Sequence, residues 1–189
     1  MLFFLFFTSV TFGESVAAFE KGVIAYQSGE YEKAVKWFTL SVKRGVASAQ
    51  SNLGVMYKHG QGVTQDYKQA VKWFRLAAEQ GVAISQYELG LFFQNGKGVI
   101  QDYKQAVKWL KLAAEQGHAD AQFSLSGHYY GSTLNDIVYA HMWSNIASSN
   151  NAESALTFRD VIAKKMTKEQ IAEAQKLARE CVAKDYKGC

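Results

Sequence analysis

The sequence contains no proline, and this absence restricts the fold. Long strand-and-turn architectures rarely form without proline, whereas a helical protein can build its turns from glycine, of which the chain has 15. Hydrophobic residues make up 48% of the 189 residues and charged residues 20%, a composition typical of a globular domain and not of a disordered chain. We therefore expect a compact helical protein.

An excess of charge of one sign is also missing. The formal net charge is only +4, and lysines and arginines alternate with aspartates and glutamates along the chain. A surface that binds nucleic acid would show a basic stripe without acidic neighbours. The sequence therefore argues against a nucleic-acid partner.

Motifs for catalysis or metal binding are absent as well. No pair of histidines has the spacing of His-Glu-x-x-His, and neither Gly-x-Ser-x-Gly nor a cysteine with a nearby histidine base occurs. Gly60-x-Gly62 and Gly96-x-Gly98 join two helical patterns, whereas a phosphate loop follows a strand. The histidines are His59, His118, His128 and His141. We expect no enzymatic activity, no cofactor and no metal.

A repeat dominates what is present. QDYKQAVKWFRLAAEQG at 65–81 recurs as QDYKQAVKWLKLAAEQG at 101–117, with two substitutions. Tyr31, Tyr67 and Tyr103 lie 36 residues apart. All four tryptophans take the same place in successive copies: Trp37, Trp73, Trp109 and Trp143. A period of this length is typical of a solenoid.

Each copy is predicted to form two helices. In the second helix the apolar positions follow a helical spacing, at Ala70, Trp73, Phe74 and Ala77. Asp66 is placed to cap its start and Gly81 to end it. A single helix pair cannot bury its tryptophan, but stacked pairs can, so we expect the four indole rings to be mostly buried. The predicted fold is all-α: an α/α superhelical solenoid of stacked antiparallel helix pairs, capped by a C-terminal helix pair.

The pattern A-x3-L-G-x2-Y-x2-G-x-G-V-x2-D-Y-x2-A-x2-W-x3-A-A-x2-G resembles the Sel-1-like repeat, a relative of the tetratricopeptide repeat. Residues 49–84 carry nearly every element. The N-terminal unit has the shorter turn of a plain tetratricopeptide repeat, and the fourth has Ser126 for the glycine and Leu134 in a loop without Gly-x-Gly. The resemblance implies an adaptor without catalysis, often periplasmic or secreted in bacteria.

Domain boundaries follow from these units. We predict a signal peptide at 1–17, a tetratricopeptide-like first repeat at 18–46, Sel-1-like repeats at 47–84, 85–118 and 119–150, and C-terminal capping helices at 151–189.

The N-terminus and the two cysteines both predict export. Leu2–Val10 is an apolar run followed by small residues, as in a secretory signal, with cleavage expected after Gly13 or Ala17. The alternative is an apolar helix that packs in the fold. In an exported chain Cys181 and Cys189 are expected to form a disulfide; in a cytosolic one they would be free thiols. We predict a periplasmic or secreted bacterial protein without a stable membrane span after cleavage.

The differences between repeats predict a binding surface. The copies 49–84 and 85–120 agree at 15 of 17 positions in the second helix but at 3 of 11 in the first. First helices line the concave groove in solenoids of this type. The variable stripe is Ser51, Val55 and Lys58 in one copy, Tyr87, Leu91 and Gln94 in the next, and Phe123, Gly127 and Tyr130 in the third. We expect its aromatic rings to be exposed for a partner, the alternative being surface drift or core between repeats.

The predicted function is an exported scaffold that binds another protein or a peptide through this groove. The alternative is a cell-envelope protein that interacts with peptidoglycan or β-lactams, or that regulates an enzyme. A third reading is a secreted effector directed at a host.

Overall fold

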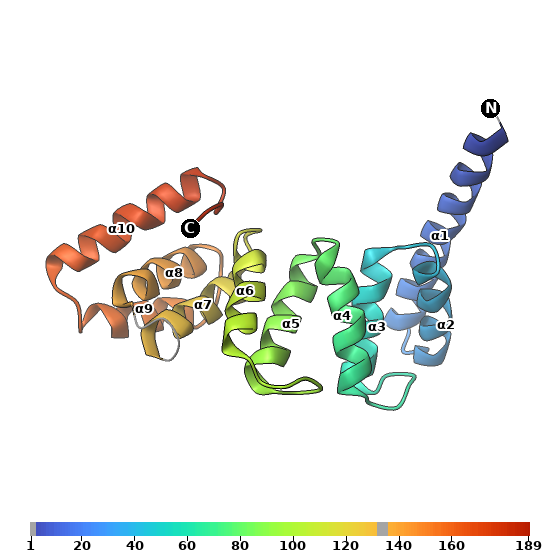
Figure 1. The fold of residues 1–189 in the computed structure, drawn as a ribbon, viewed down its shortest axis with the longest axis horizontal. Coiled ribbons are helices and arrows are strands. Elements are labelled where there is room, and N and C mark those ends of the chain that lie inside the picture. The colour runs from blue at the N-terminus through green and yellow to red at the C-terminus, as the bar shows by residue number, and fades with distance from the viewer. Residues whose placement is uncertain (1–2, 132–135) are drawn as a thin grey trace. The chain divides into compact units, whose positions relative to one another are not determined.

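The computed structural model describes residues 3–131 and 136–189. The first two residues of the predicted signal peptide, and residues 132–135 in the loop of the fourth repeat with Leu134, lie outside the described residues. The described residues form helices and no strands (Figure 1). The helices are α1 (Phe3–Gln27), α2 (Tyr31–Val42), α3 (Ala47–His59), α4 (Tyr67–Glu79), α5 (Ala83–Asn95), α6 (Tyr103–Ala114), α7 (Ala119–Gly131), α8 (Ile137–Ser149), α9 (Ala155–Ala163) and α10 (Lys168–Ala183). Among them, none has both the length and the apolar character needed to cross a membrane.

The chain divides into two compact units. The first runs up to Ser85 and includes Lys97–Ile100, and the second comprises Gln86–Gly96 and Gln101–Cys189. Within the first unit α1 packs on α2, α2 on α3 and α3 on α4. Within the second, α6 packs on α7 and α7 on α8, and both α9 and α10 pack on α8 (Figure 1). The predicted all-α repeat fold is confirmed.

Close contact between a glycine and a large side chain joins the two helices of a repeat. A Cβ atom at Gly54 of α3 would lie 2.8 Å from Cδ1 of Phe74 in α4, and one at Gly22 would lie 2.6 Å from the ring of Phe38. Real Cβ atoms do not approach other atoms this closely. Only glycine therefore lets the Phe38 and Phe74 rings lie fully buried against the facing helix backbone.

The same contact changes in a coordinated way along the chain. In the third repeat Gly90 faces Leu110, whose Cγ would lie 2.8 Å from an added Cβ. In the fourth repeat both partners are serines, and the hydroxyls of Ser126 and Ser144 form a buried hydrogen bond of 2.5 Å. The loss of glycine at Ser126 is thus accompanied by loss of the bulky partner, and a small polar pair fills the space.

The second glycine of the connecting loop packs on the preceding repeat. Gly62 has a φ of 69°, and an added Cβ would lie 2.5 Å from the carbonyl carbon of Tyr31. Gly98 repeats this arrangement against the carbonyl group of Tyr67. The Gly-x-Gly loops are therefore contacts between repeats, which agrees with their structural interpretation.

Helix ends follow the predicted signals. The carboxylate of Asp66 accepts hydrogen bonds from the backbone N–H groups of Lys68 and Gln69, and Asp102 and Asp136 cap their helices in the same way. Gly81 ends the α4 turn with a φ of 89°. Thr167 and Gln170 form a reciprocal capping box at the start of α10.

The tryptophans differ in burial more than expected. Trp109 and Trp143 have exposed fractions of 8% and 1%, which confirms the prediction for them. Trp37 and Trp73 pack against the core of the first unit but are only partly buried. Their outer edges lie at the surface, so equivalence in the repeat does not make burial equal.

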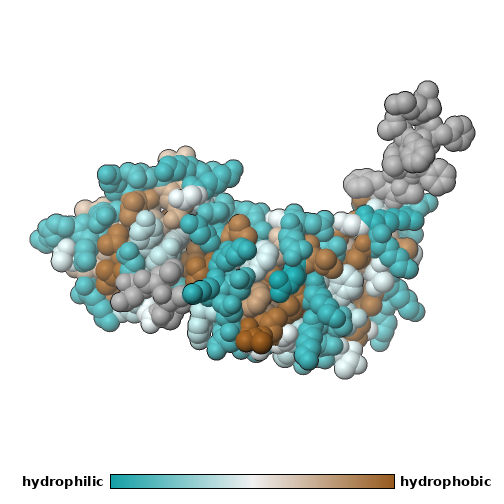
Figure 2. Space-filling model, in the orientation of Figure 1, coloured by the Kyte–Doolittle hydropathy of each residue, from teal (hydrophilic) through white to brown (hydrophobic). Residues whose placement is uncertain are grey.

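The C-terminal helix covers the last repeat. Ala174 and Ala178 of α10 are buried in one core cluster with Trp143 and Ile146 of α8. The outer side of α10 carries polar side chains (Figure 2). Cys181 belongs to the same cluster and is joined to Cys189 by a disulfide, which ties the tail back onto α10.

We expect Gly54→Ala to destabilise the protein by about 1–3 kcal/mol through overpacking against Phe74. Gly127→Ala is the matched control, because it lies within α7 and an added Cβ meets nothing within 4 Å. Replacement of a helical glycine by alanine in open space stabilises by about 0.5–1 kcal/mol. Urea unfolding followed by circular dichroism should therefore give a lower free energy of unfolding for Gly54→Ala and a higher one for Gly127→Ala. Equal changes in the two variants would contradict the close contact at Gly54.

Candidate functional site

A pocket in the second unit brings several variable-stripe residues together. Its volume is about 480 Å³. The walls come from the end of α5, the start of α6, one face of α7 and one ring of α9. Its lining residues are Gln94, Asn95, Gln101, Tyr103, Phe123, Ser124, Gly127, His128 and Phe158. None of them is an acid, a lysine or an arginine, so the pocket has no fixed charge in its lining.

The polar wall is held in place by side-chain amides. The Gln101 amide donates to the backbone carbonyl of Gln94 at 2.7 Å and to the Tyr103 hydroxyl at 3.0 Å. The Gln94 side-chain oxygen lies 3.3 Å from Nε2 of His128. These contacts fix the Tyr103 ring, whose centroid lies 6.2 Å from that of His128 in an edge-on arrangement. The loop between Gln94 and Gln101 contains Gly96 and Gly98, the second Gly-x-Gly pair of the sequence.

Aromatic rings form the opposite wall. Phe158 of α9 meets Phe123 edge-on at a centroid distance of 5.7 Å and Tyr130 at 5.4 Å. The Lys165 ammonium lies 5.1 Å from the Tyr130 ring centroid. Together these contacts place an apolar surface beside the amide wall, an arrangement common in binding sites.

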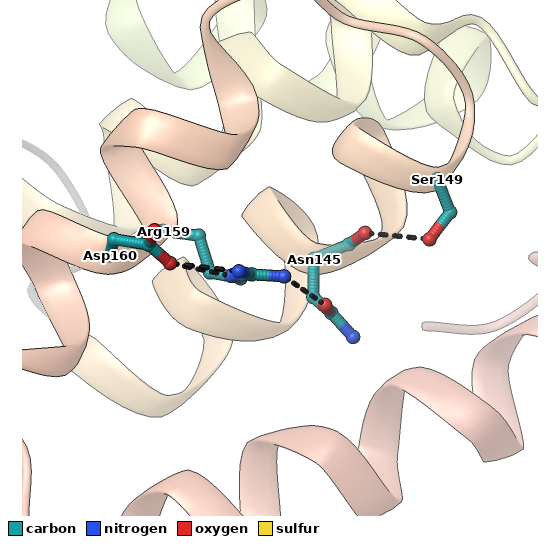
Figure 3. A network of polar contacts seen from close by, with 4 residues as sticks. All are labelled: Asn145, Ser149, Arg159 and Asp160. Atoms are coloured by element: carbon teal, nitrogen blue, oxygen red, sulfur yellow. Dashed lines mark hydrogen bonds and ion pairs between the residues drawn. The ribbon is translucent and has the colours of Figure 1, made fainter.

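A polar network attaches α9 to α8 and so positions Phe158. The Arg159 guanidinium donates to the side-chain oxygen of Asn145 in α8 at 3.3 Å and to Asp160 at 2.8 Å (Figure 3). Ser149 donates to the Asn145 backbone carbonyl at 3.1 Å. Phe158 directly precedes Arg159, so the network holds the helix that carries this ring against α8.

The predicted groove residues do not all reach an open surface. Ser51 has an exposed fraction of 6% and accepts a hydrogen bond from Ser85 at 2.9 Å, so it is a packing residue and the expectation of a surface role for it is wrong. Gln94, Phe123 and Gly127 line the pocket, and Tyr130 packs on its Phe158 wall. The others, Val55, Lys58, Tyr87 and Leu91, are half-buried and lie outside the pocket lining.

The two stripe aromatics that we expected to be exposed contribute to packing. Tyr87 stacks on His118 at a centroid distance of 4.7 Å and packs against the core of the second unit. Phe123 packs against the cluster of Ala147, Ala152 and Ala155. Both rings are partly buried, so the expectation that they are exposed for a partner is corrected: neighbouring side chains of the same unit cover part of each ring.

Reasoning from the repeats missed His128, Gln101 and Phe158. His128 is one of the four histidines whose spacing predicts no metal site, and Phe158 lies in a capping helix outside the repeats. A second missed feature is an amide pair that repeats along the chain: Gln80 donates to Gln50, Gln116 to Gln86 and Asn150 to Gln122, at 2.6, 2.7 and 2.9 Å. The recurring glutamine near the start of each first helix was the available signal.

Burial lowers the pKa of three histidines in the second unit. For His128 desolvation is the cause. For His118 desolvation outweighs the opposing charges of Asp120 and Glu88, and for His141 desolvation acts together with the nearby Arg159 charge. Within the described residues no three His, Cys, Asp or Glu side chains come together as a metal site would require.

The Sel1 repeat profile matches four consecutive stretches, residues 17–46, 47–82, 83–118 and 119–151, which is more than half of the chain. The chain belongs to the Sel1 repeat family. Sel1 repeat proteins generally mediate protein–protein interaction and are typically non-catalytic scaffolds. No curated protein matches the sequence.

Solved structures show the same fold. One is c5321, a protective antigen of uropathogenic Escherichia coli with the same repeat fold; it is 33% identical, has a TM-score of 0.82, and matches 92% of this chain and 40% of its own. Another is a Sel1 repeat protein from Oxalobacter formigenes, 26% identical with a TM-score of 0.68, matching 86% of this chain and 75% of its own. This chain thus spans about two fifths of the antigen.

Lowered histidine pKa values predict a pH-dependent stability. The unfolded chain takes up protons near the ordinary histidine pKa of about 6.5, whereas the folded chain resists protonation until lower pH. The contribution of these histidines to the free energy of unfolding is therefore fully present above pH 6.5 and is lost as the pH falls below this value. We expect a lower melting temperature at pH 5.5 than at pH 7.5. His128→Asn should reduce the change of melting temperature between these two pH values, and a variant with the same change as the wild type would contradict the assignment.

Proposed function

We propose that this Sel1 repeat protein binds an extended segment of a partner protein and anchors one uncharged side chain in the pocket between α5, α7 and α9. The observation that carries the proposal is the pocket itself. It is lined by Gln94, Phe123 and Gly127, which vary between repeats, and it joins an amide wall to an aromatic wall.

The lining chemistry selects the anchor. A charged side chain would lose its hydration on entering and would find no opposite charge among the lining residues. An aliphatic or aromatic side chain can pack against Phe123 and Phe158. The neighbouring peptide groups of the same segment can hydrogen-bond with the amides of Gln94 and Asn95 at the rim.

Gly127→Leu tests this pocket without removing any existing contact. An added Cβ there meets nothing within 4 Å, so the leucine side chain occupies pocket space without a clash near the backbone. Gly131→Leu is the matched control, since Gly131 lies in the same helix, also has open space, and does not line the pocket.

A peptide display library selected on the wild-type protein should yield sequences that share an uncharged apolar anchor. By fluorescence anisotropy, Gly127→Leu should weaken their binding by roughly tenfold or more, the effect expected for loss of a hot spot. Gly131→Leu should bind as the wild type does. Selection of charged anchors, or equal binding by both variants, would exclude the pocket as the site.

We further propose that the protein is exported, with its signal peptide removed after Gly13. The structure favours this bond over the one after Ala17 for a packing reason. Ser15 is buried, and its backbone carbonyl accepts a hydrogen bond from the Ser41 hydroxyl at 2.9 Å. Glu14 pairs with Arg44 at 2.9 Å. Cleavage after Ala17 would remove both contacts, one with α2 and one with the turn that follows it, whereas cleavage after Gly13 keeps them.

Intact-mass analysis of the protein from its native compartment should show a chain that begins at Glu14. It should also be lighter by two hydrogens than the reduced form, because the Cys181–Cys189 disulfide persists in an oxidising compartment. A chain that retains Met1, or begins at Ala18, would contradict the cleavage proposal. Free thiols at both cysteines would contradict export.

A further inference from the structure

A leucine at one repeat position of the second helices is left uncovered until the last repeat. Leu40 of α2, Leu76 of α4 and Leu112 of α6 occupy the same repeat position and have exposed fractions of 39%, 44% and 37%. In the fourth repeat this position is Ile146, with an exposed fraction of 2%. The difference arises because α10 packs on α8 at this place.

The contact between α10 and α8 shows what kind of element fits this face. Ala178 and Val182 of α10 line one hollow together with Asn145 and Ile146 of α8, and Leu177 and Cys181 line a second one together with Tyr139 and Met142. An amphipathic helix with small and aliphatic residues on one side is thus the intramolecular occupant.

The equivalent face of α2 is open and carries a different charge. A hollow of about 540 Å³ there is lined by Lys33, Lys36, Trp37, Thr39, Leu40 and Lys43. Aligned on Trp37 and Trp143, these positions correspond to Tyr139, Met142, Trp143, Asn145, Ile146 and Ser149 of α8. The lysines of the first repeat therefore stand where the covered repeat has uncharged residues.

We propose that the α2 face binds an amphipathic helix of a partner protein, with a stripe of small and aliphatic residues flanked by acidic ones. The stripe would cover Trp37 and Leu40 as α10 covers Trp143 and Ile146. Acidic flanks complement the lysines that border the hollow, and electrostatic complementarity of this kind sets the choice of partner.

Local charges favour the first repeat over its neighbours. The Lys21 ammonium lies 4.7 Å from the Trp37 ring centroid and adds a further cation, while Lys33 pairs with Glu30 at 2.9 Å. The Lys33 position is Gln69 in α4 and Gln105 in α6, and the Lys43 position is Glu79 in α4 and Glu115 in α6. The leucine at the same repeat position is therefore flanked by mixed charge in these two repeats.

A second copy of this chain is a poor occupant. Its α10 and the residue after it border the α8 contact with Arg179, Glu180 and Lys184, and this net positive set would lie against the lysines of the first repeat. Like charges across an interface oppose binding. The partner helix therefore differs from α10 in the charge of the residues that flank its apolar stripe: these are acidic in the partner and net basic in α10.

Two synthetic peptides separate charge from shape. Both span residues 168–184 with Cys181→Ala, and the acidic peptide also carries Arg179→Glu and Lys184→Glu. Binding to the full-length protein is measured by fluorescence anisotropy in low salt. We expect the acidic peptide to bind at least about tenfold more tightly than the unreversed one.

Matched variants then locate the site. Lys36→Glu with Lys43→Glu should weaken binding of the acidic peptide by roughly tenfold or more. Lys72→Glu with Lys108→Glu makes the same change of net charge on the outer sides of α4 and α6 and should leave binding nearly unchanged. Leu40→Glu should also weaken binding of the acidic peptide, whereas Leu76→Glu should leave it nearly unchanged. Circular dichroism verifies that all four variants keep their helical content.

Several outcomes would overturn the proposal. They are absence of binding by the acidic peptide, equal loss in both lysine variants, and equal affinity for the two peptides. Self-association of the wild type that Lys36→Glu with Lys43→Glu abolishes would instead identify a second copy as the occupant. The pocket between α5, α7 and α9 is not involved, so Gly127→Leu should bind the acidic peptide as the wild type does. This test is therefore independent of the function proposed for that pocket.

Discussion

The close approach of a helix backbone to a bulky side chain at a glycine is the constraint on which the packing of the first three repeats depends. The Phe74 ring lies where any side chain at position 54 would be, so the pair can close only in the absence of a Cβ. The exposed Gln80 amide of the same helix pair donates a hydrogen bond at 2.6 Å to the side-chain oxygen of Gln50, which is buried and finds its partner there. The amide pair persists in the fourth repeat, where Asn150 donates to Gln122 and Ser126 replaces the glycine, so the amide contact accompanies the helix pair and does not depend on the glycine alone.

The repeated part of the fold could be predicted because repetition exposes what packing requires. Helix pairs, aspartate caps at Asp66 and Asp102, and the glycine turns all recur at a fixed period, and a feature that recurs with a packing period has a packing cause. The same logic failed at Ser51. It varies between copies, and yet it is buried because its neighbour Ser85 also varies and the two form a local pair.

Only part of the candidate site could be found by this route. Gln94, Phe123 and Gly127 were identified as variable, but the ring that completes the pocket comes from α9, which has no counterpart in the repeats. Comparison of copies within one chain cannot reveal a contact made once. His128 was missed for the same reason, since its partner Gln94 is a lysine, Lys58, in the previous copy.

The loop glycines impose a direction on the assembly of the first unit. Gly62 packs against the amino-terminal end of α2, and Gly98 against that of α4, so each helix pair receives its last contact from a loop that lies later in the chain. During synthesis on the ribosome a second helix thus lacks this contact at its amino-terminal end until the next first helix and its loop have emerged. A nascent chain that stops within α3 therefore lacks the Gly62 contact and leaves the amino-terminal end of α2 uncovered at that place.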